Sequence, residues 1–122
     1  MKTESNVNKL LKERQQSWFY GEVKEQAGTP PMLVLKHRNG NESAYGYHFL
    51  SKCINYNPSE GIKLRFIDSE GVNSILIEGR NLTKLWETLT RHRVTFIREL
   101  ENNFSEPEDD TLCVININLT NQ

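Results

Sequence analysis

The tripeptide Arg91-His92-Arg93 holds the side chains best suited to bind an anion or a charged partner. Arg93 is the unusual member, because helical steps of about 100° per residue place it near the middle of an apolar stripe. A cation there can recognise an anion or a partner surface. A carboxylate from the sheet, a snorkelling stem, or a break in helix phase that turns Val94 inward would also explain it. Arg91, His92 and Arg93 are therefore the candidate anion or partner site.

A second basic tripeptide, Lys36-His37-Arg38, raises the alternative of a nucleic-acid-binding barrel whose cations alternate with strand tyrosines. The chain has no net positive charge that would attract nucleic acid, because 15 Lys and Arg residues against 16 Asp and Glu residues give a net charge of −1. We therefore expect that nucleic acid is not the partner. The alternative requires the basic residues to gather on one face, namely Lys36, Arg38, Arg91 and Arg93.

No residues are spaced as in a known catalytic or metal-binding motif. The sequence has no GxSxG, no glycine-rich phosphate loop and no HExxH, and its three histidines do not fall at metal-ligand spacing. Cys53 and Cys113 stand far apart and are expected to be reduced, buried thiols. We expect no catalysis, no cofactor and no metal. The alternative, a small-ligand carrier or enzyme, requires an apolar pocket in which Arg93, His92 and Tyr47 converge.

The main element expected to position these residues is a helix over residues 81–101. Asn81 is expected to cap its start by accepting a backbone N–H. A lone helix of this length is marginal in water, so a sheet must cover its apolar face. The residues that recur at helical steps are Leu82, Leu85, Trp86, Leu89, Phe96, Ile97 and Leu100.

Strand hairpins are expected over residues 32–78, and Asn39-Gly40 is the strongest short-range signal among them. A two-residue loop there would place Val34 opposite Tyr45 and Met32 opposite Tyr47. Both faces of this hairpin would then be apolar, although one helix can cover only one of them. The outward face is a candidate interface made of Met32, Val34, Tyr45 and Tyr47.

Residues 52–56 predict a short strand, and a second hairpin follows it. Ile62, Leu64 and Phe66 alternate with charged residues, which is typical of a strand with one buried face. A four-residue loop at residues 68–71 would set the register, because it also pairs apolar with apolar residues. The expected pairs are Ile67 with Val72, Leu64 with Ile75, and Ile62 with Ile77.

The two ends of the chain predict a short helix over residues 5–16 and a last strand over residues 112–119. An acidic, proline-bearing linker over residues 102–111 precedes that strand. The linker would let the strand close its own sheet or add to the sheet of a second copy. Ile115 and Ile117, which lie with Cys113 and Leu119 on one side of the strand, complete the candidate interface.

The sequence as a whole predicts one α+β domain: an antiparallel, curved sheet or partly open barrel of about five to seven strands with one long helix. This order of elements is similar to that of pleckstrin-homology-like barrels, from which the strand after the helix departs. No leader or membrane-spanning segment is evident, so we expect a cytoplasmic protein. We expect a small interaction module without catalysis, which forms a homodimer through a sheet face or an exchanged strand and could also bind another protein.

Overall fold

The computed structural model describes residues 18–24, 27–51, 54–101 and 111–121. These residues form an α+β fold with two four-stranded sheets, so the predicted class is confirmed. The expected single sheet or partly open barrel of five to seven strands is wrong, because the eight strands of the described ranges divide into two sheets of four. The helix predicted over 5–16 lies outside the described residues, as does the linker of 102–111 except for Thr111.

Sheet I has the strand order β1-β7-β2-β3. Its strands are β1 (Tyr20–Glu22), β7 (Val94–Arg98), β2 (Met32–Lys36) and β3 (Glu42–Gly46). β2 and β7 run parallel, with Lys36 beside Arg98, so this sheet is mixed and not wholly antiparallel as predicted. A parallel pair needs a long crossover connection, and here the second sheet and a helix supply it.

Sheet II is antiparallel and has the order β4-β5-β6-β8. Its strands are β4 (Asn55–Asn57), β5 (Gly61–Asp68), β6 (Gly71–Arg80) and β8 (Cys113–Asn121). The predicted β5–β6 register is confirmed, since Ile67 pairs with Val72, Leu64 with Ile75 and Ile62 with Ile77. The last strand pairs with β6 of its own chain.

The predicted long helix is wrong in its second half. The helix α2 covers only Thr83–Thr90, and the following apolar residues form strand β7. His92 has a φ of 55°, its N–H bonds to the Leu89 carbonyl at 2.9 Å, and the Arg93 N–H bonds to the Thr88 carbonyl at 3.1 Å. These two bonds form a Schellman motif that ends the helix. The break in helix phase at this tripeptide is therefore real, and it turns Val94 inward.

The predicted cap at Asn81 is also wrong. The N-cap residue of α2 is Leu82, which makes no side-chain cap hydrogen bond. Asn81 has a φ of 56°, and its side-chain Nδ2 donates to the Thr111 carbonyl at 3.0 Å. Asn81 therefore ties the turn before the helix to the start of β8.

The first hairpin is shifted by one residue from the prediction. Met32 pairs with Gly46, Val34 with Ala44 and Lys36 with Glu42. The His37 N–H bonds to the Asn41 carbonyl, and Gly40 has a φ of 92°, so the loop has three residues with glycine in the left-handed region. A shift by one residue moves opposing side chains to different faces. Tyr45 consequently shares the inner face with Leu33.

Strand β8 carries an irregularity that the alternating pattern did not predict. Glu78 pairs with Asn116 but Gly79 pairs with Val114, so Ile115 is the extra residue of a bulge. Val114 is fully buried and Ile115 only half-buried, whereas strict alternation puts Ile115 on the same side as Cys113 and Ile117. Ile117, which the candidate interface included, is buried. An ideal Cβ on Gly79 would lie 2.0 Å from the Cys113 carbonyl oxygen, so only glycine fits beside the bulge.

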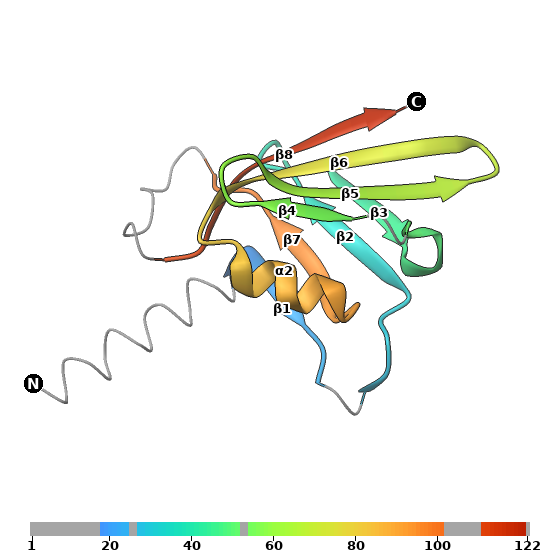
Figure 1. Cartoon of the computed structure of the whole chain (residues 1–122), viewed down its shortest axis with the longest axis horizontal. Helices are drawn as coiled ribbons and strands as arrows, with labels where there is room; N and C mark the ends of the chain where they lie inside the picture. The colour runs from blue at the N-terminus through green and yellow to red at the C-terminus, as the bar shows by residue number, and fades with distance from the viewer. Residues whose placement is uncertain (1–17, 25–26, 52–53, 102–110, 122) are drawn as a thin grey trace, which may run out of the picture.

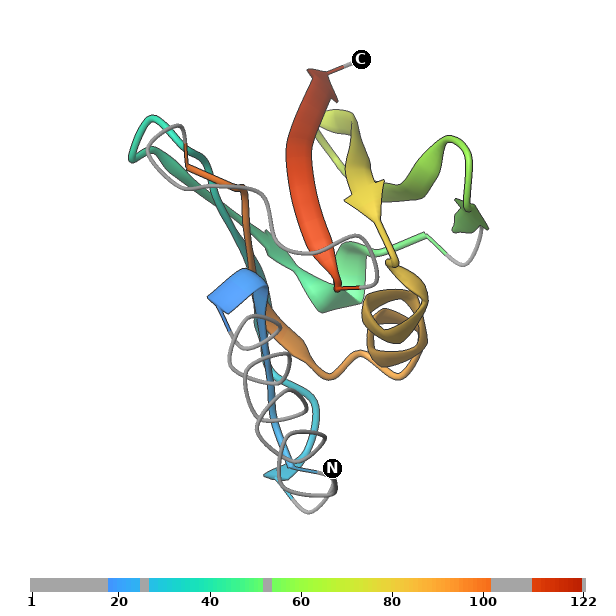
Figure 2. The same ribbon diagram turned by 90° about the vertical axis from the view of Figure 1, so that its left-hand side faces the viewer.

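The two sheets face each other, and α2 lies at one end of the space between them (Figures 1 and 2). The α2 helix connects β6 of sheet II to β7 of sheet I. At another connection between the sheets, the short 3-10 helix η2 (Tyr47–Phe49) leads from β3 toward sheet II. The core between these layers includes Leu33, Leu35, Ile62, Leu64, Ile75, Ile77, Leu85, Leu89 and Ile97. Within the described ranges, no helix is long and apolar enough to cross a membrane.

Candidate functional site

The three residues of the predicted anion site occupy the helix stop and separate from one another. Arg91 directs its Nε toward the Glu87 carbonyl at 3.4 Å. Arg93 is half-buried, and its Nη1 donates to the Gly28 carbonyl at 2.7 Å. The His92 ring stacks on the Tyr47 ring, with a centroid distance of 5.0 Å. These contacts give each side chain a local structural partner.

Tyr47 meets His92, as the ligand-carrier alternative requires, but in a packed arrangement. Tyr47 is 4% exposed, and its hydroxyl donates to the Val94 carbonyl at 2.6 Å. Burial raises the pKa of the Tyr47 phenol far above its usual value, so the hydroxyl stays protonated and remains a donor. The pair fastens η2 to the start of β7.

The basic residues of the nucleic-acid alternative lie at opposite ends of sheet I. Lys36 ends β2 and is the register partner of Arg98 at the end of β7. Arg91 and Arg93 precede Val94, where β7 begins. The length of β7 therefore separates the two basic tripeptides, and the single basic face required by that alternative does not form.

The predicted interface residues are divided between two faces. Met32 and Val34 point outward from sheet I, and Met32 is 42% exposed. Tyr45 points inward and stacks on Phe66 of sheet II at 4.9 Å between ring centroids. Tyr47 is buried, as described above. Only Met32 and Val34 of this hairpin set are available on the outer face.

A polar cluster around Glu99 joins the two sheets, and the sequence prediction missed it. Glu99 follows β7 and is 6% exposed. Its Oε1 accepts the Arg38 N–H at 2.8 Å, and its Oε2 accepts the Ile117 N–H at 2.6 Å. The Arg38 Nη2 donates to the Ile115 carbonyl at 2.6 Å and also bonds to the Asn116 side chain. One carboxylate and one guanidinium thus clamp the β2–β3 loop to the edge of β8.

His37 and Ser43 extend this cluster across sheet I. The His37 Nε2 lies 3.3 Å from the Ser43 Oγ, and its Nδ1 lies 3.8 Å from the Glu99 Oε1. The residue types match a nucleophile, base and acid relay, but 3.8 Å exceeds hydrogen-bond distance. Both Glu99 oxygens already accept backbone N–H groups. Ser43, His37 and Glu99 therefore hold the strands in position, and we assign them no catalytic role.

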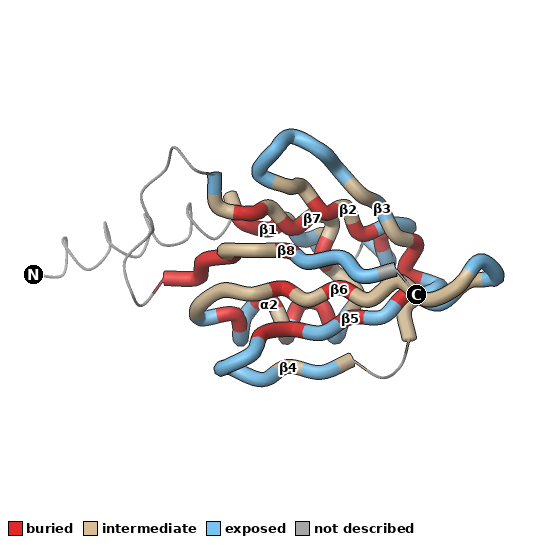
Figure 3. The backbone as a smooth tube through the Cα atoms, turned by 90° about the horizontal axis from the view of Figure 1, so that it is seen from above, coloured by how far each residue is buried: buried red, intermediate tan, exposed pale blue. Residues whose placement is uncertain are grey.

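The clamp covers only the first half of the β8 edge. The Ile117 N–H points away from β6 toward Glu99, so the backbone groups of Leu119 and Asn121 also point away from β6 by the alternation of an antiparallel pair. Among the described residues, no hydrogen bond is recorded for the outward backbone groups of Leu119. Figure 3 shows β8 passing from buried at its start to exposed toward its end. Leu119 is 42% exposed.

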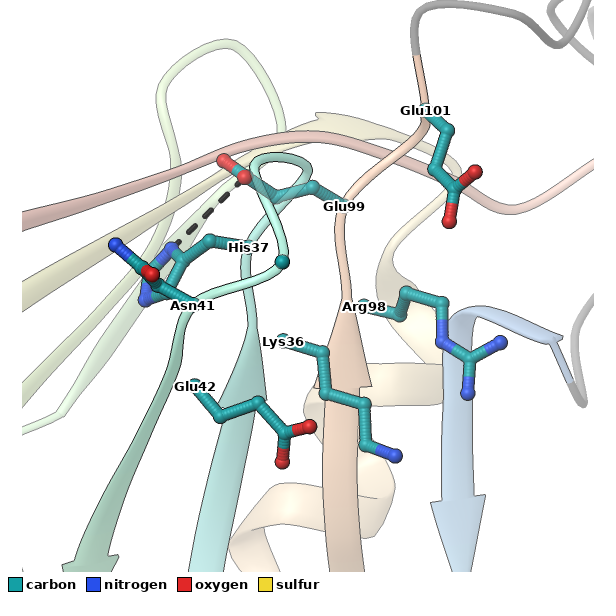
Figure 4. Close-up of a pocket in the computed structure, with 8 residues that line it drawn as sticks. Lys36, His37, Asn41, Glu42, Arg98, Glu99 and Glu101 are labelled. Atoms are coloured by element: carbon teal, nitrogen blue, oxygen red, sulfur yellow. Dashed lines mark ion pairs between the residues drawn. The ribbon is translucent and has the colours of Figure 1, made fainter.

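The outer face of sheet I ends in a shallow polar hollow of about 220 Å³. Lys36 and Arg98 lie side by side at its floor, and the Glu99 and His37 pair lies behind them (Figure 4). The Lys36 Nζ is 5.0 Å from the centre of the Phe96 ring, and the Arg98 Cζ is 5.3 Å from it. The remaining lining residues are Gly40, Asn41, Glu42 and Glu101.

No arrangement of side chains in the described ranges indicates a metal centre, since no group of three or more His, Cys, Asp or Glu residues could hold an ion there. The clamp has little signal in the sequence, because Glu99 and Arg38 are 61 positions apart and each resembles an ordinary surface charge. The one available clue was that Glu99 falls next to the predicted apolar stripe.

The fold and these contacts define an α+β protein of two facing sheets, bridged in the described residues by α2 and fastened by a buried carboxylate. No protein-family model matches the chain, and no significant match was found among curated proteins or solved structures.

Proposed function

We propose that this chain is a small, non-catalytic interaction module that acts as a homodimer, in which β8 of one copy pairs with β8 of another. The observation that supports the proposal is the β8 edge, which is closed over its first half and which no other described residue covers over its second half. Edge strands in natural proteins usually carry charges, prolines or bulges that prevent such pairing. Residues 117–121 contain neither a charge nor a proline.

The closed first half of the β8 edge limits how many residues of a second copy can pair with β8. The bulge at Ile115 disrupts the ladder, the Arg38 guanidinium occupies the Ile115 carbonyl, and Glu99 occupies the Ile117 N–H. An added strand can therefore pair only from the Ile117 carbonyl onward. Pairing that extended further would have to displace a buried carboxylate, which is costly.

A two-fold axis through Leu119 satisfies the open half. Each Leu119 would donate its N–H to the Leu119 carbonyl of the other copy, and each Asn121 N–H would donate to the Ile117 carbonyl of the other copy. Asn118 would then lie opposite Thr120, polar against polar on the same face. The two exposed Leu119 side chains would cover each other, and the two copies of sheet II would become one continuous sheet.

The experiment is native mass spectrometry of the full-length protein across a concentration series, together with the variant Leu119→Lys. Lysine places like charges opposite each other at the axis. We therefore expect the dissociation constant of the dimer to rise at least tenfold, or ~1.4 kcal/mol. Ile67→Lys is the matched control, since Ile67 is 45% exposed on sheet II but lies at the β5–β6 loop. It should leave the dimer unchanged.

Two results would contradict the proposal. A wild-type protein that stays monomeric at every concentration removes the homodimer altogether. A dimer that Leu119→Lys leaves intact removes the β8 edge as its interface, and Met32→Lys would then test the outer face of sheet I.

A further inference from the structure

Lys36 and Arg98 form a pair of neighbouring cations on the outer face of sheet I. They are register partners on parallel strands, so their side chains leave the sheet together (Figure 4). Leu35 and Ile97, which precede them, are fully buried, and this alternation fixes Lys36 and Arg98 on the outside. Like charges placed side by side on neighbouring strands repel each other.

Aromatic rings hold the two cations in place without neutralising them. Lys36 and Arg98 both lie over the Phe96 ring, and the Arg98 Cζ is also 4.8 Å from the centre of the Trp18 ring. In the described part of the chain, neither cation makes a hydrogen bond or an ion pair with a carboxylate. The guanidinium therefore keeps its fork of N–H donors available for an oxyanion.

The acidic residues of the hollow restrict the charge of any ligand. Glu99 is committed to two backbone N–H groups and to Arg38, with its Oε1 3.8 Å from the Arg38 Nε. Glu42, the cross-strand partner of Lys36, and Glu101 remain exposed at the rim. A dianion such as phosphate would meet repulsion from both rim carboxylates, whereas a single carboxylate between the two cations would meet less. The charges favour a monoanion.

An apolar strip leads away from this pair along β2. Val34 lies beside Phe96 in the register, Ala44 lies beside Val34, and Met32 follows at the far end of the strand. An ideal Cβ on Gly21 would be 2.5 Å from the Phe96 Cε1, so glycine at this position lets the ring lie flat across β1. The cations thus stand at one end of an open apolar surface.

We propose that this face binds a small organic acid whose single carboxylate lies between Lys36 and Arg98 and whose apolar group packs on Phe96 and Val34. The hollow of about 220 Å³ beside the two cations has room for the carboxylate end of such a molecule, while its apolar group lies outside the hollow, along β2. This binding surface is separate from the β8 edge, so the inference does not depend on the proposed homodimer.

The test uses phenylacetate as the probe and NMR titration of the full-length protein as the measurement. Phenylacetate should shift signals of β2 and β7 and bind at least tenfold more tightly than acetate, which lacks the apolar group, or 2-phenylethanol, which lacks the carboxylate. Lys36→Gln and Arg98→Gln should each weaken phenylacetate binding at least tenfold. Lys63→Gln, which removes an exposed cation of sheet II, should not change it.

The inference is overturned if phenylacetate binds no better than the two partial probes, or if the Lys36 and Arg98 variants bind it as well as the wild type does. Tighter binding by phenylphosphonate would overturn the preference for a monoanion. Tighter binding by a short peptide with an apolar C-terminal residue would overturn the assignment to a free small acid.

Discussion

The Glu99 carboxylate accepts the backbone N–H of Ile117 at 2.6 Å, although Glu99 follows a strand of one sheet and Ile117 lies in the other. The second oxygen of the same carboxylate accepts the Arg38 N–H from the β2–β3 loop. One buried side chain therefore joins the end of β7 to two other segments, whose backbone N–H groups would otherwise lack a partner. It also determines which part of the β8 edge remains open.

Glu99→Gln should destabilise the fold by about 2–4 kcal/mol. The amide offers one acceptor oxygen, so its NH₂ group would face one of the two backbone N–H donors, and Arg38 would lose its counter-charge. Chemical denaturation measures the difference. Glu101→Gln is the control, because Glu101 is exposed, and its cost should stay within about 0.5 kcal/mol. A Glu99→Gln cost as small as that of the control would show that the clamp contributes little.

The β5–β6 hairpin was predictable because two independent local signals agreed. The loop at residues 68–71 and the alternation of Ile62, Leu64 and Phe66 required the same register. In the first hairpin, Asn39-Gly40 fits both a two-residue loop and a three-residue loop with glycine in the left-handed region. The contact between Arg38 and Glu99 accompanies the longer loop, and a contact across 61 positions leaves no local signal.

The predicted helix is too long because the helical spacing of apolar residues continues past His92, where the backbone leaves the helical conformation. Phe96, Ile97 and Leu100 continue the period of Leu85 and Leu89 by coincidence. The run Val94-Thr95-Phe96-Ile97 is rich in β-branched and aromatic residues, which favour a strand. The parallel partner β2, far away in the sequence, decides between the two structures.

The helix stop at His92 predicts a clear order of stability among variants. His92→Val should cost about 1–2 kcal/mol, because a β-branched side chain fits poorly at a φ of 55°. His92→Gly relieves the backbone but loses the ring contact with Tyr47, so its net effect should stay within about 1 kcal/mol. Thermal unfolding of both variants provides the comparison. If valine were tolerated as well as glycine, the helix stop would not depend on this conformation.

We expect alanine to destabilise the fold more at Gly79, beside the bulge, than at Gly40, in an open turn. In Gly79→Ala the new Cβ would overlap the Cys113 carbonyl oxygen, so β6 and β8 must separate, at a cost of about 3 kcal/mol. In Gly40→Ala nothing lies within 4 Å, and only the positive φ opposes the change, at about 1 kcal/mol. Urea unfolding of the two variants tests the order. Equal costs would mean that the bulge relaxes freely.

Tyr47 predicts a loss of stability at high pH. Burial raises the pKa of its phenol in the folded protein above the ordinary value of 10.0. Above about pH 10 the unfolded chain releases this proton while the folded chain keeps it, so the unfolded state binds fewer protons and stability falls as pH rises. The slope from this one group reaches at most ~1.4 kcal/mol per pH unit.

Tyr47→Phe separates the two contributions of this residue. Near pH 7 the variant should be less stable by about 1 kcal/mol, because the Val94 carbonyl loses its donor. Above about pH 10 its stability should fall less steeply than that of the wild type, since the group that resists ionisation is gone. The phenolate absorbance of the folded protein near pH 11 should be almost the same in both, since Tyr47 is not ionised there. A clear drop in that absorbance in the variant would mean that Tyr47 ionises while the protein is folded, and would contradict its burial against β7.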